Sequence, residues 1–202
     1  RAFHQFGHKN DTVDSRQIAE YAARFSDQLT FWTPKKPMVE HVRVLLTTRE
    51  QFTTQATANM NVLHALRRKH IQTPLANRMH QDTIDHLKEQ IQEIDIELKR
   101  LISQDSSWSQ MVANLIATPG VQLLMAAHLL VLTQGFTKVI TYQQLSAHLG
   151  MCPYEHQSGS SVYFRPRSRQ HGPSVLRKLF YLAALSVSQH NQKFKTYFLR
   201  KV

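Results

Sequence analysis

The stretch IDHLKEQIQEIDIELKRL, residues 84–101, sets the fold class of this 202-residue chain. Its apolar residues recur at alternating steps of three and four, which is the heptad spacing of a coiled-coil seam. Charged side chains cover the other faces of the expected helix. The pattern predicts a long helix that buries one narrow stripe, formed by Ile84, Leu87, Ile91, Ile94, Leu98 and Leu101.

A second long helix is predicted before this seam, over roughly 30 residues that end before Pro74. Arg49 and Asn59 interrupt its apolar stripe, which consists of Val42, Leu45, Phe52, Ala56, Leu63 and Leu66. The two segments predict an antiparallel helical hairpin within residues 33–109. Two interpretations of the seam stay open. It packs on the body of the same chain, or it dimerises, since two long exposed helices otherwise leave apolar surface in water.

The rest of the chain is also predicted to be mainly α. Residues 33–37 contain two prolines and are expected to be a linker. Residues 159–172 are expected to be irregular or a hairpin. Helical spacing and end signals predict further helices from Asn10 or Asp11 to Phe25, at residues 111–116, 123–132 and 141–149, and from near Ser174 onward, with Thr141 as an N-cap and Gly150 as a stop.

Charge is distributed unevenly along the chain. The formal net charge is +11, and residues 111–202 carry ten Lys and Arg against the single acidic residue Glu155. This half is therefore predicted to bind a polyanion such as DNA or RNA. The longest apolar run, residues 123–132, is too short to cross a membrane. Cys152 is the only cysteine, which excludes an internal disulfide and is compatible with a reducing cytoplasm.

Two short motifs each have a chemical and a structural interpretation. Asp11 and Asp14 lie three residues apart at a helix start, where they could share a divalent metal, but the helix dipole favours acidic residues there in any case. The turn 119–122 resembles that of a helix-hairpin-helix, whose backbone amides bind DNA phosphates. Gln122 replaces the usual second glycine, so Gly120 has either this role or only a packing role.

The basic segment 150–179 contains the candidate catalytic residue. Arg165, Arg167 and Arg169 have a period of two, which in an extended strand puts them on one face toward consecutive phosphates. Ser158 precedes a glycine, so a phosphate could approach its hydroxyl closely on a flexible turn. A serine needs activation to act as a nucleophile, and the nearby candidates are His156, His171 and the arginines. The structural alternative for Ser158 is a plain turn.

Taken together, the motifs resemble the transposases of the one-ten class of insertion sequences, a family that includes the pilin-gene invertases and the bridge-RNA-guided recombinases. Lys9-Asn10-Asp11 and Asp14-Ser15 resemble the end of that family's RuvC-like domain. The similarity to its terminal transposase domain lies in Thr118-Pro119-Gly120-Val121, Leu149-Gly150-Met151-Cys152-Pro153, Gln157-Ser158-Gly159 and Leu176-Arg177-Lys178-Leu179, while Gly172-Pro173 departs from the usual Gly-Asn.

The resemblance implies three domains. Residues 1–32 would end an RNase H/RuvC-like domain in which Asp11 and Asp14 bind Mg²⁺. Residues 33–109 would form the coiled-coil hairpin, and residues 110–202 a small helical domain with a basic loop. In that last domain Ser158 would be the nucleophile, and the residues expected to bind nucleic acid are Arg165, Arg167, Arg169, Arg177, Lys178 and Gly120.

A DNA transposase or site-specific recombinase of the bacterial cytoplasm, associated with the nucleoid, is the expected function. It would form a dimer or tetramer through the coiled coil and contact no membrane, and the resemblance leaves open whether a structured guide RNA takes part. We expect two further acidic residues upstream of this chain, so that the chain alone would be inactive. The alternative is a non-catalytic DNA- or RNA-binding fragment, which the absence of those upstream acids would favour.

Overall fold

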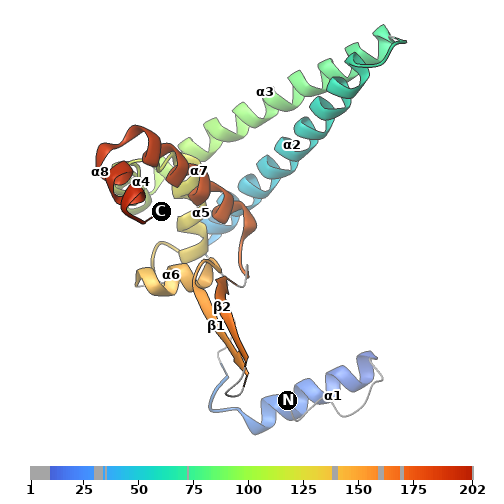
Figure 1. Ribbon diagram of the computed structural model, residues 1–202. Helices are drawn as coiled ribbons and strands as arrows, with labels where there is room; N and C mark the ends of the chain where they lie inside the picture. Colours follow the sequence, from blue (N-terminus) through green and yellow to red (C-terminus); the bar gives the residue numbers. More distant parts are fainter. Residues whose placement is uncertain are drawn as a thin grey trace. The chain divides into compact units, whose positions relative to one another are not determined.

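The computed structural model describes residues 10–29, 34, 36–71, 73–137, 141–158, 162–168 and 171–201. It confirms the mainly α fold, with one two-stranded sheet in the described part of the chain (Figure 1). The chain divides into two compact units, Arg1–Lys35 and Lys36–Val202. Among the described residues, no helix has both the length and the apolar composition that a membrane span requires.

The first unit contains helix α1, Asp11–Arg24. It begins where the sequence predicts, because the side-chain oxygen of Asn10 accepts a hydrogen bond from the backbone N–H of Val13 at 2.8 Å. The rings of Tyr21 and Phe25 lie 4.8 Å apart near its end. No residue of α1 is buried, so local capping and the acidic first turn are what support the helix within this unit.

The second unit begins with the predicted hairpin of two long helices, α2, Pro37–Arg67, and α3, Pro74–Gln104. Each helix starts with a proline in its first turn, where the missing N–H costs no intrahelical hydrogen bond. Figure 1 shows the two helices side by side and antiparallel, and they make the most extensive contact between any two elements of the described chain.

The apolar seam of α3 is turned toward α2 of the same chain. Ile84 and Leu98 are each only 2% exposed, Leu87 and Ile94 are also buried, and Ile91 and Leu101 are partly buried. α2 supplies the matching stripe, with Val39, Val42, Leu46, Ala56 and Leu63 buried. Of the two interpretations of the seam, the structure supports packing within the chain. A dimerisation role stays a prediction for Ile84, Leu87, Ile91, Ile94, Leu98 and Leu101.

Leu98→Ala is expected to destabilise the chain by about 3 kcal/mol, because it removes a fully buried side chain from the hairpin. The loss should be the same at low and high protein concentration, since the partner helix belongs to the same chain. Denaturant unfolding at two widely different concentrations measures this. Ile96→Ala, on an exposed position of the same helix, should change stability by less than about 0.5 kcal/mol. A loss that grows on dilution would instead indicate an interchain seam.

The two residues that interrupt the stripe of α2 both find polar partners on α3. Arg49 donates two hydrogen bonds to the carboxylate of Asp95, at 2.7 and 3.1 Å. The Nδ1 atom of His80 lies 2.8 Å from the side-chain oxygen of Asn59. The two contacts lie 15 residues or fewer apart along each helix, on the side where α2 and α3 meet. Sliding one helix along the other would separate the polar partners, so these pairs disfavour other registers of the two helices.

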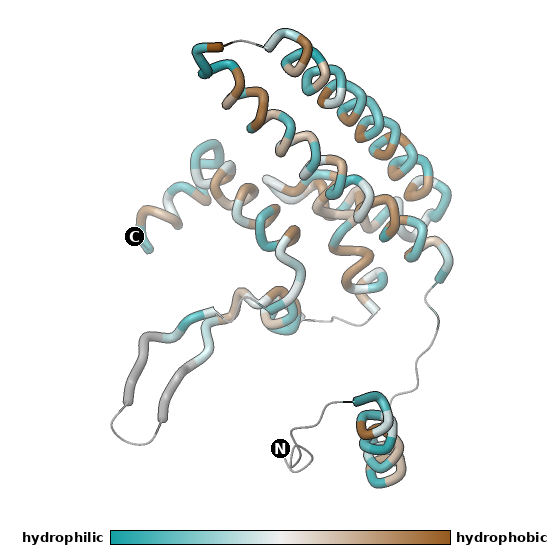
Figure 2. Tube along the Cα trace, turned by 90° about the vertical axis from the view of Figure 1, so that its right-hand side faces the viewer, coloured by the Kyte–Doolittle hydropathy of each residue, from teal (hydrophilic) through white to brown (hydrophobic). Residues whose placement is uncertain are grey.

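Helices α4, Ser106–Ile116, and α5, Leu123–Thr133, pack against the open end of the hairpin. α4 starts five residues earlier than the periodicity predicts, because the carboxylate of Asp105 accepts a hydrogen bond from the N–H of Trp108 at 3.0 Å. α5 is apolar almost throughout (Figure 2). The main core joins α2, α3, α4 and α5 through Val42, Leu98, Ile102, Trp108, Val112, Ala126, Ala127 and Leu130, among others.

A second, smaller core joins α5 to the C-terminal elements. It consists of Met125, Leu129, Leu149 and Leu176, all buried. Helix α6, Tyr142–His148, precedes Leu149 and begins with Thr141 as predicted, in a capping box with Gln144. Helix α7, Ser174–His190, starts at the predicted residue, and α8, Gln192–Lys201, follows it without having been predicted.

His128 of α5 faces α2 across a pocket of about 360 Å³. Burial lowers the pKa of its imidazole to about 4, and the positive charge of Arg49 adds to the effect. The folded chain therefore favours the neutral ring. The other residues that line the pocket are Leu46, Thr47, Glu50, Gln51, Thr54, Gln55 and Val175.

Stability is expected to fall by about 3 kcal/mol as the pH drops from 7 to 4, because the ring is protonated near pH 6.5 in the unfolded chain but only near pH 4 in the folded one. The contribution of the neutral His128 ring to the free energy of unfolding is complete above pH 6.5 and is lost as the pH approaches 4. Unfolding free energies of the natural chain and of His128→Leu across this range measure it. Equal pH dependence in the two proteins would contradict the assignment to His128.

Candidate functional site

Ser158 lies at the far end of a β-hairpin. Strand β1, Pro153–Ser158, pairs antiparallel with β2, Val162–Ser168, and Ser158 opposite Val162 is the last pair before the connecting residues. The hairpin thus starts six residues earlier than the segment in which the sequence allowed one. The side chains of Ser158 and His156, and all of Gly159, lie outside the described residues. The backbone position places Ser158 beside the loop at the tip.

The arginines of the basic loop belong to β2, but its alternation is interrupted. The strand register shifts between Tyr154 and His156, which places Arg165 and Pro166 together opposite a single residue of β1. Pro166 has no N–H to donate to the ladder, so a bulge is the expected place for it. The prediction that Arg165, Arg167 and Arg169 share one face assumed an unbroken strand and does not follow from this register. Arg167 is exposed, and Arg169 lies outside the described residues.

The base of the hairpin is a close crossing of two backbone segments. Gly150, after α6, has φ +66°, and a Cβ built on it would lie 1.9 Å from the carbonyl oxygen of His171. Gly172, before α7, has φ +96°, and its Cβ would lie 2.2 Å from the carbonyl oxygen of His148. Only glycine fits this backbone conformation and this spacing at both positions. The two ends of the hairpin are therefore held in contact.

Arg177 ties this crossing to the start of α7. Its Nη1 atom donates to the carbonyl oxygens of Gly172, His171 and Leu149, at 2.9, 3.1 and 3.3 Å. Three carbonyls from both ends of the hairpin thus share one cationic group, which makes strong hydrogen bonds. One nitrogen of the Arg177 guanidinium is thus used within the fold, and the contact of Arg177 with nucleic acid stays a prediction. Lys178, the next residue, is exposed.

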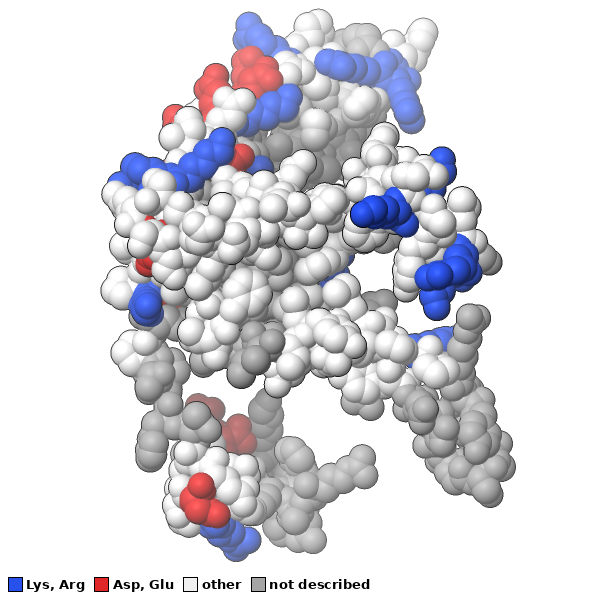
Figure 3. Space-filling view, turned by 90° about the vertical axis from the view of Figure 1, so that its left-hand side faces the viewer, with Lys and Arg blue, Asp and Glu red and all other residues white. Residues whose placement is uncertain are grey.

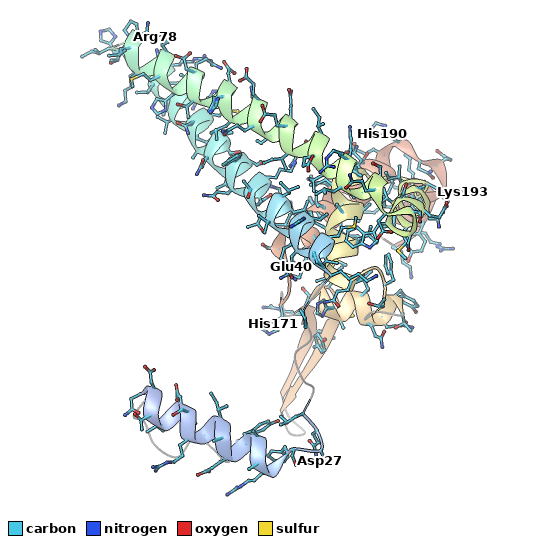
Figure 4. The ribbon with its side chains drawn as sticks, turned by 180° about the vertical axis from the view of Figure 1, so that it is seen from behind. Asp27, Glu40, Arg78, His171, His190 and Lys193 are labelled. Atoms are coloured by element: carbon cyan, nitrogen blue, oxygen red, sulfur yellow. The ribbon has the colours of Figure 1, made fainter. Side chains whose placement is uncertain are left out.

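The crossing is anchored in the smaller core. Leu149 is fully buried directly before Gly150, and Leu176 is 1% exposed directly before Arg177. Both pack with Met125 and Leu129 of α5. His171, one of the proposed activating residues, is exposed at this base (Figure 4). The base of the hairpin is thus built into the domain, while the chain that carries Ser158 extends away from it.

Gly120 has a packing role in the structure. It adopts φ +84° in the turn between α4 and α5, and a Cβ there would lie 2.8 Å from the Cγ1 atom of Val187 and 3.2 Å from the carbonyl oxygen of Ala183. α7 therefore approaches the turn so closely that it leaves no room for a side chain. Of the two interpretations of this turn, the structure supports packing, and the contact of Gly120 with nucleic acid stays a prediction.

Asp11 and Asp14 lie together in the first turn of α1. Their spacing puts both carboxylates on one side of the turn, and both are accessible enough to meet a ligand. In the described part of the chain, no group of three or more His, Cys, Asp or Glu side chains is placed to hold a metal ion. Two carboxylates fit Mg²⁺, which usually keeps several waters, and they equally fit the preference of a helix start for acidic residues.

Sequence reasoning missed the residues that hold the hairpin in place. Gly150 was predicted as a helix stop, Gly172 was noted only in the Gly172-Pro173 pair, and Arg177 was read as a cation, but nothing in their local sequence shows that they meet. The available signal is their arrangement, since two glycines flank the basic segment and an arginine follows the second by five residues.

Part of the chain matches a known protein family. Residues 112–199 match the family model described as Transposase IS116/IS110/IS902 family. The matched segment starts in α4 and contains α5, α6, the β-hairpin and α7. No curated protein matches the chain.

Proposed function

We propose, from the premise that this chain belongs to the IS116/IS110/IS902 transposase family, that it cuts and rejoins DNA strands with Ser158 as the nucleophile. Membership of a transposase family makes DNA the partner and transposition or recombination the reaction class. The observation that carries the finer proposal is the position of Ser158, at the tip of a basic hairpin whose base is built into the matched domain.

The proposed chemistry is a phosphoryl transfer to the protein and back. The Oγ atom of Ser158 attacks a backbone phosphorus, and the bond from that phosphorus to one deoxyribose oxygen breaks as the new bond forms. The serine proton passes to a base, for which His156 on the same strand is the candidate, since His171 lies at the opposite end of the hairpin. The departing oxygen takes up a proton. Attack by the hydroxyl of another strand on the phosphoserine reverses the step, so the number of phosphodiester bonds is conserved.

Cationic side chains of the hairpin would stabilise the negative charge of the DNA phosphates during the reaction. The phosphate at the attack site gains negative charge on its oxygens, and arginine is suited to bind two of them at once. Arg167 pairs with Tyr154, and Arg165 lies in the bulge beside it, both nearer the base of the hairpin than Ser158. They would therefore bind phosphates that flank the attacked one. Arg169 completes the group in sequence. We therefore assign these three residues to phosphate binding and Ser158 to bond formation.

Asp11 and Asp14 would hold Mg²⁺ in this proposal. The ion, when bound, supplies charge neutralisation at the phosphate. The two carboxylates contribute the hard oxygen ligands that this ion prefers, and waters or further residues complete its coordination. Family resemblance also suggests that these carboxylates and Ser158 come together from different copies of the chain, and that a structured RNA takes part, both of which belong to this proposal.

A covalent adduct on Ser158 is the test. The natural protein would be produced in cells together with the DNA that flanks its gene, in the presence of Mg²⁺, then denatured and digested with nuclease and protease. Mass spectrometry of the peptide around residues 150–165 should show a nucleotide phosphate on Ser158. An adduct on another residue would contradict the assignment. DNA binding without any adduct would favour the non-catalytic nucleic-acid-binding alternative.

A further inference from the structure

The outer side of α7 and the whole of α8 expose a large apolar surface. It contains Tyr181, Leu182 and Leu185 of α7 and Phe194, Tyr197 and Phe198 of α8, each between 43% and 68% exposed. We call these six residues the α7–α8 surface. α8 has no buried residue, and within the described chain it packs on α7 alone. So many exposed aromatic side chains on one pair of helices indicate an interaction surface.

The two helices meet at a defined corner. The N–H of Asn191 donates to the carbonyl oxygen of Val187 at 2.9 Å, and its side-chain oxygen accepts from the N–H groups of Lys193 and Phe194 at 3.1 and 3.4 Å. Asn191 thus ends α7 and caps α8 (Figure 4, between His190 and Lys193). On the other side of α7, Leu176, Leu179 and Phe180 belong to the smaller core. The surface therefore has a fixed shape.

Charge selects the kind of partner. α8 carries Lys193, Lys195, Arg200 and Lys201, and no acidic residue follows Glu155 anywhere in the chain. Figure 3 shows basic side chains over the C-terminal helices, at its right, without acidic ones among them. A second copy docked symmetrically through α8 would bring two such helices together, and like charges repel. A polyanion complements the same surface.

The aromatic side chains select an unpaired strand. Base faces are stacked on one another inside a duplex, whereas unpaired bases can stack on exposed Tyr and Phe rings. The guanidinium of Arg200 lies 5.4 Å from the ring centre of Tyr197, so that a cation accompanies an exposed stacking surface. Alternating aromatic and basic residues along α8 match the two parts of a single strand, its bases and its phosphates.

We propose that the α7–α8 surface binds unpaired DNA, with bases on Tyr197, Phe198 and their neighbours and phosphates on the lysines of α8. The choice of DNA over RNA rests on the proposed function, because cutting and rejoining strands exposes unpaired DNA. The surface is separate from the β-hairpin in sequence. It would retain a strand that has left its complement, rather than take part in bond formation.

Binding of short oligonucleotides to the 202-residue chain tests the proposal. The chain carries Ser158→Ala throughout, so that no chemistry contributes, and fluorescence anisotropy is measured with oligo-dT, oligo-U and a DNA duplex of equal length. Tyr197→Ala with Phe198→Ala should weaken oligo-dT binding at least about tenfold and leave duplex binding within about twofold, since each stacked base contributes roughly 5- to 150-fold. Circular dichroism confirms that the double variant is folded.

Two further variants make the test specific. Tyr142→Ala removes a tyrosine that is 76% exposed on α6, away from the α7–α8 surface, and should leave oligo-dT binding unchanged. Lys193→Gln with Lys195→Gln should weaken oligo-dT binding and lower its logarithmic salt dependence by about 1.4, at about 0.7 for each phosphate contact. A Tyr142→Ala effect as large as that of the Tyr197 and Phe198 pair would overturn the assignment.

Other outcomes would also overturn it. If the Tyr197→Ala and Phe198→Ala double variant loses equal affinity for oligo-dT and for the duplex, general charge attraction explains the binding and base stacking does not. Binding to oligo-U at least tenfold tighter than to oligo-dT, lost in the same double variant, would make RNA the partner. Loss of self-association in that variant, with oligo-dT binding intact, would make a second copy the partner. Because every measurement uses Ser158→Ala, failure here leaves the nucleophile untouched, and failure of the adduct experiment leaves this surface untouched.

Discussion

Ser158→Ala is expected to abolish strand exchange and the covalent protein–DNA adduct. Removal of a catalytic nucleophile lowers turnover by roughly 10⁴-fold or more, because no other group at that position can form the bond to phosphorus. DNA binding should stay within about twofold, since a neutral hydroxyl adds little to the phosphate affinity of a basic domain. Recombination of a reporter carrying the natural flanking DNA measures exchange, and denaturing gels measure the adduct.

Ser160→Ala and Ser161→Ala provide matched controls. Both serines follow Ser158 within three residues of the sequence, so each tests whether a neighbouring hydroxyl contributes to the reaction. Exchange by these two variants should remain within about threefold of the natural protein, an effect small against loss of a nucleophile. An adduct that persists in Ser158→Ala but disappears in Ser160→Ala or Ser161→Ala would move the nucleophile to that neighbour.

Gly150→Ala is expected to lower the free energy of unfolding by about 4 kcal/mol, the largest effect on stability that we predict. Part of the loss comes from a left-handed backbone at φ +66°, and the larger part from a Cβ 1.9 Å from a carbonyl oxygen of the crossing strand. Backbone atoms cannot move away as a flexible side chain can. The crossing at the base of the hairpin must open to make room. Denaturant unfolding measures the loss.

Gly135→Ala separates the two contributions. Gly135 has nearly the same backbone angle, φ +68°, but its nearest neighbours are side-chain atoms of Trp108 and Met111 at 3.6 and 3.8 Å. Gly135→Ala should lower the free energy of unfolding only by the cost of a left-handed backbone at an alanine, about 1–2 kcal/mol. If both alanine variants lose the same stability, the close approach at Gly150 has no energetic weight, and the hairpin base is not the rigid crossing described above.

Much of the architecture could be predicted because it depends on neighbours in the sequence. The seam of α3, the capped start of α6 at Thr141 and the start of α7 at Ser174 follow from periodicity and end signals within a few residues. α8 was not predicted, although Asn191 is a suitable cap and Phe194, Tyr197 and Phe198 have helical spacing, since its ten residues leave that apolar side exposed rather than buried in a core.

The candidate site was harder to predict, because one kind of side chain can serve two purposes. A guanidinium binds any oxygen acceptor, and Arg177 was assigned to phosphates from its place in a basic segment, whereas it binds three backbone carbonyls. A glycine at a turn leaves its amide open to a ligand or lets another helix approach, and at Gly120 it is α7 that approaches. The local sequence is the same in both cases.

By itself, the sequence determined the mainly α fold, the hairpin of α2 and α3, the basic C-terminal half and the motifs that relate residues 112–199 to a transposase family. Only the tertiary structure decided which partner each surface has. In the structure, the seam of α3 packs on α2, and the base of the β-hairpin is a crossing formed by Gly150, Gly172 and Arg177. The α7–α8 surface remains exposed. The reason is physical, since spacing and capping act over a few residues, whereas the partner of a side chain depends on segments distant in the chain.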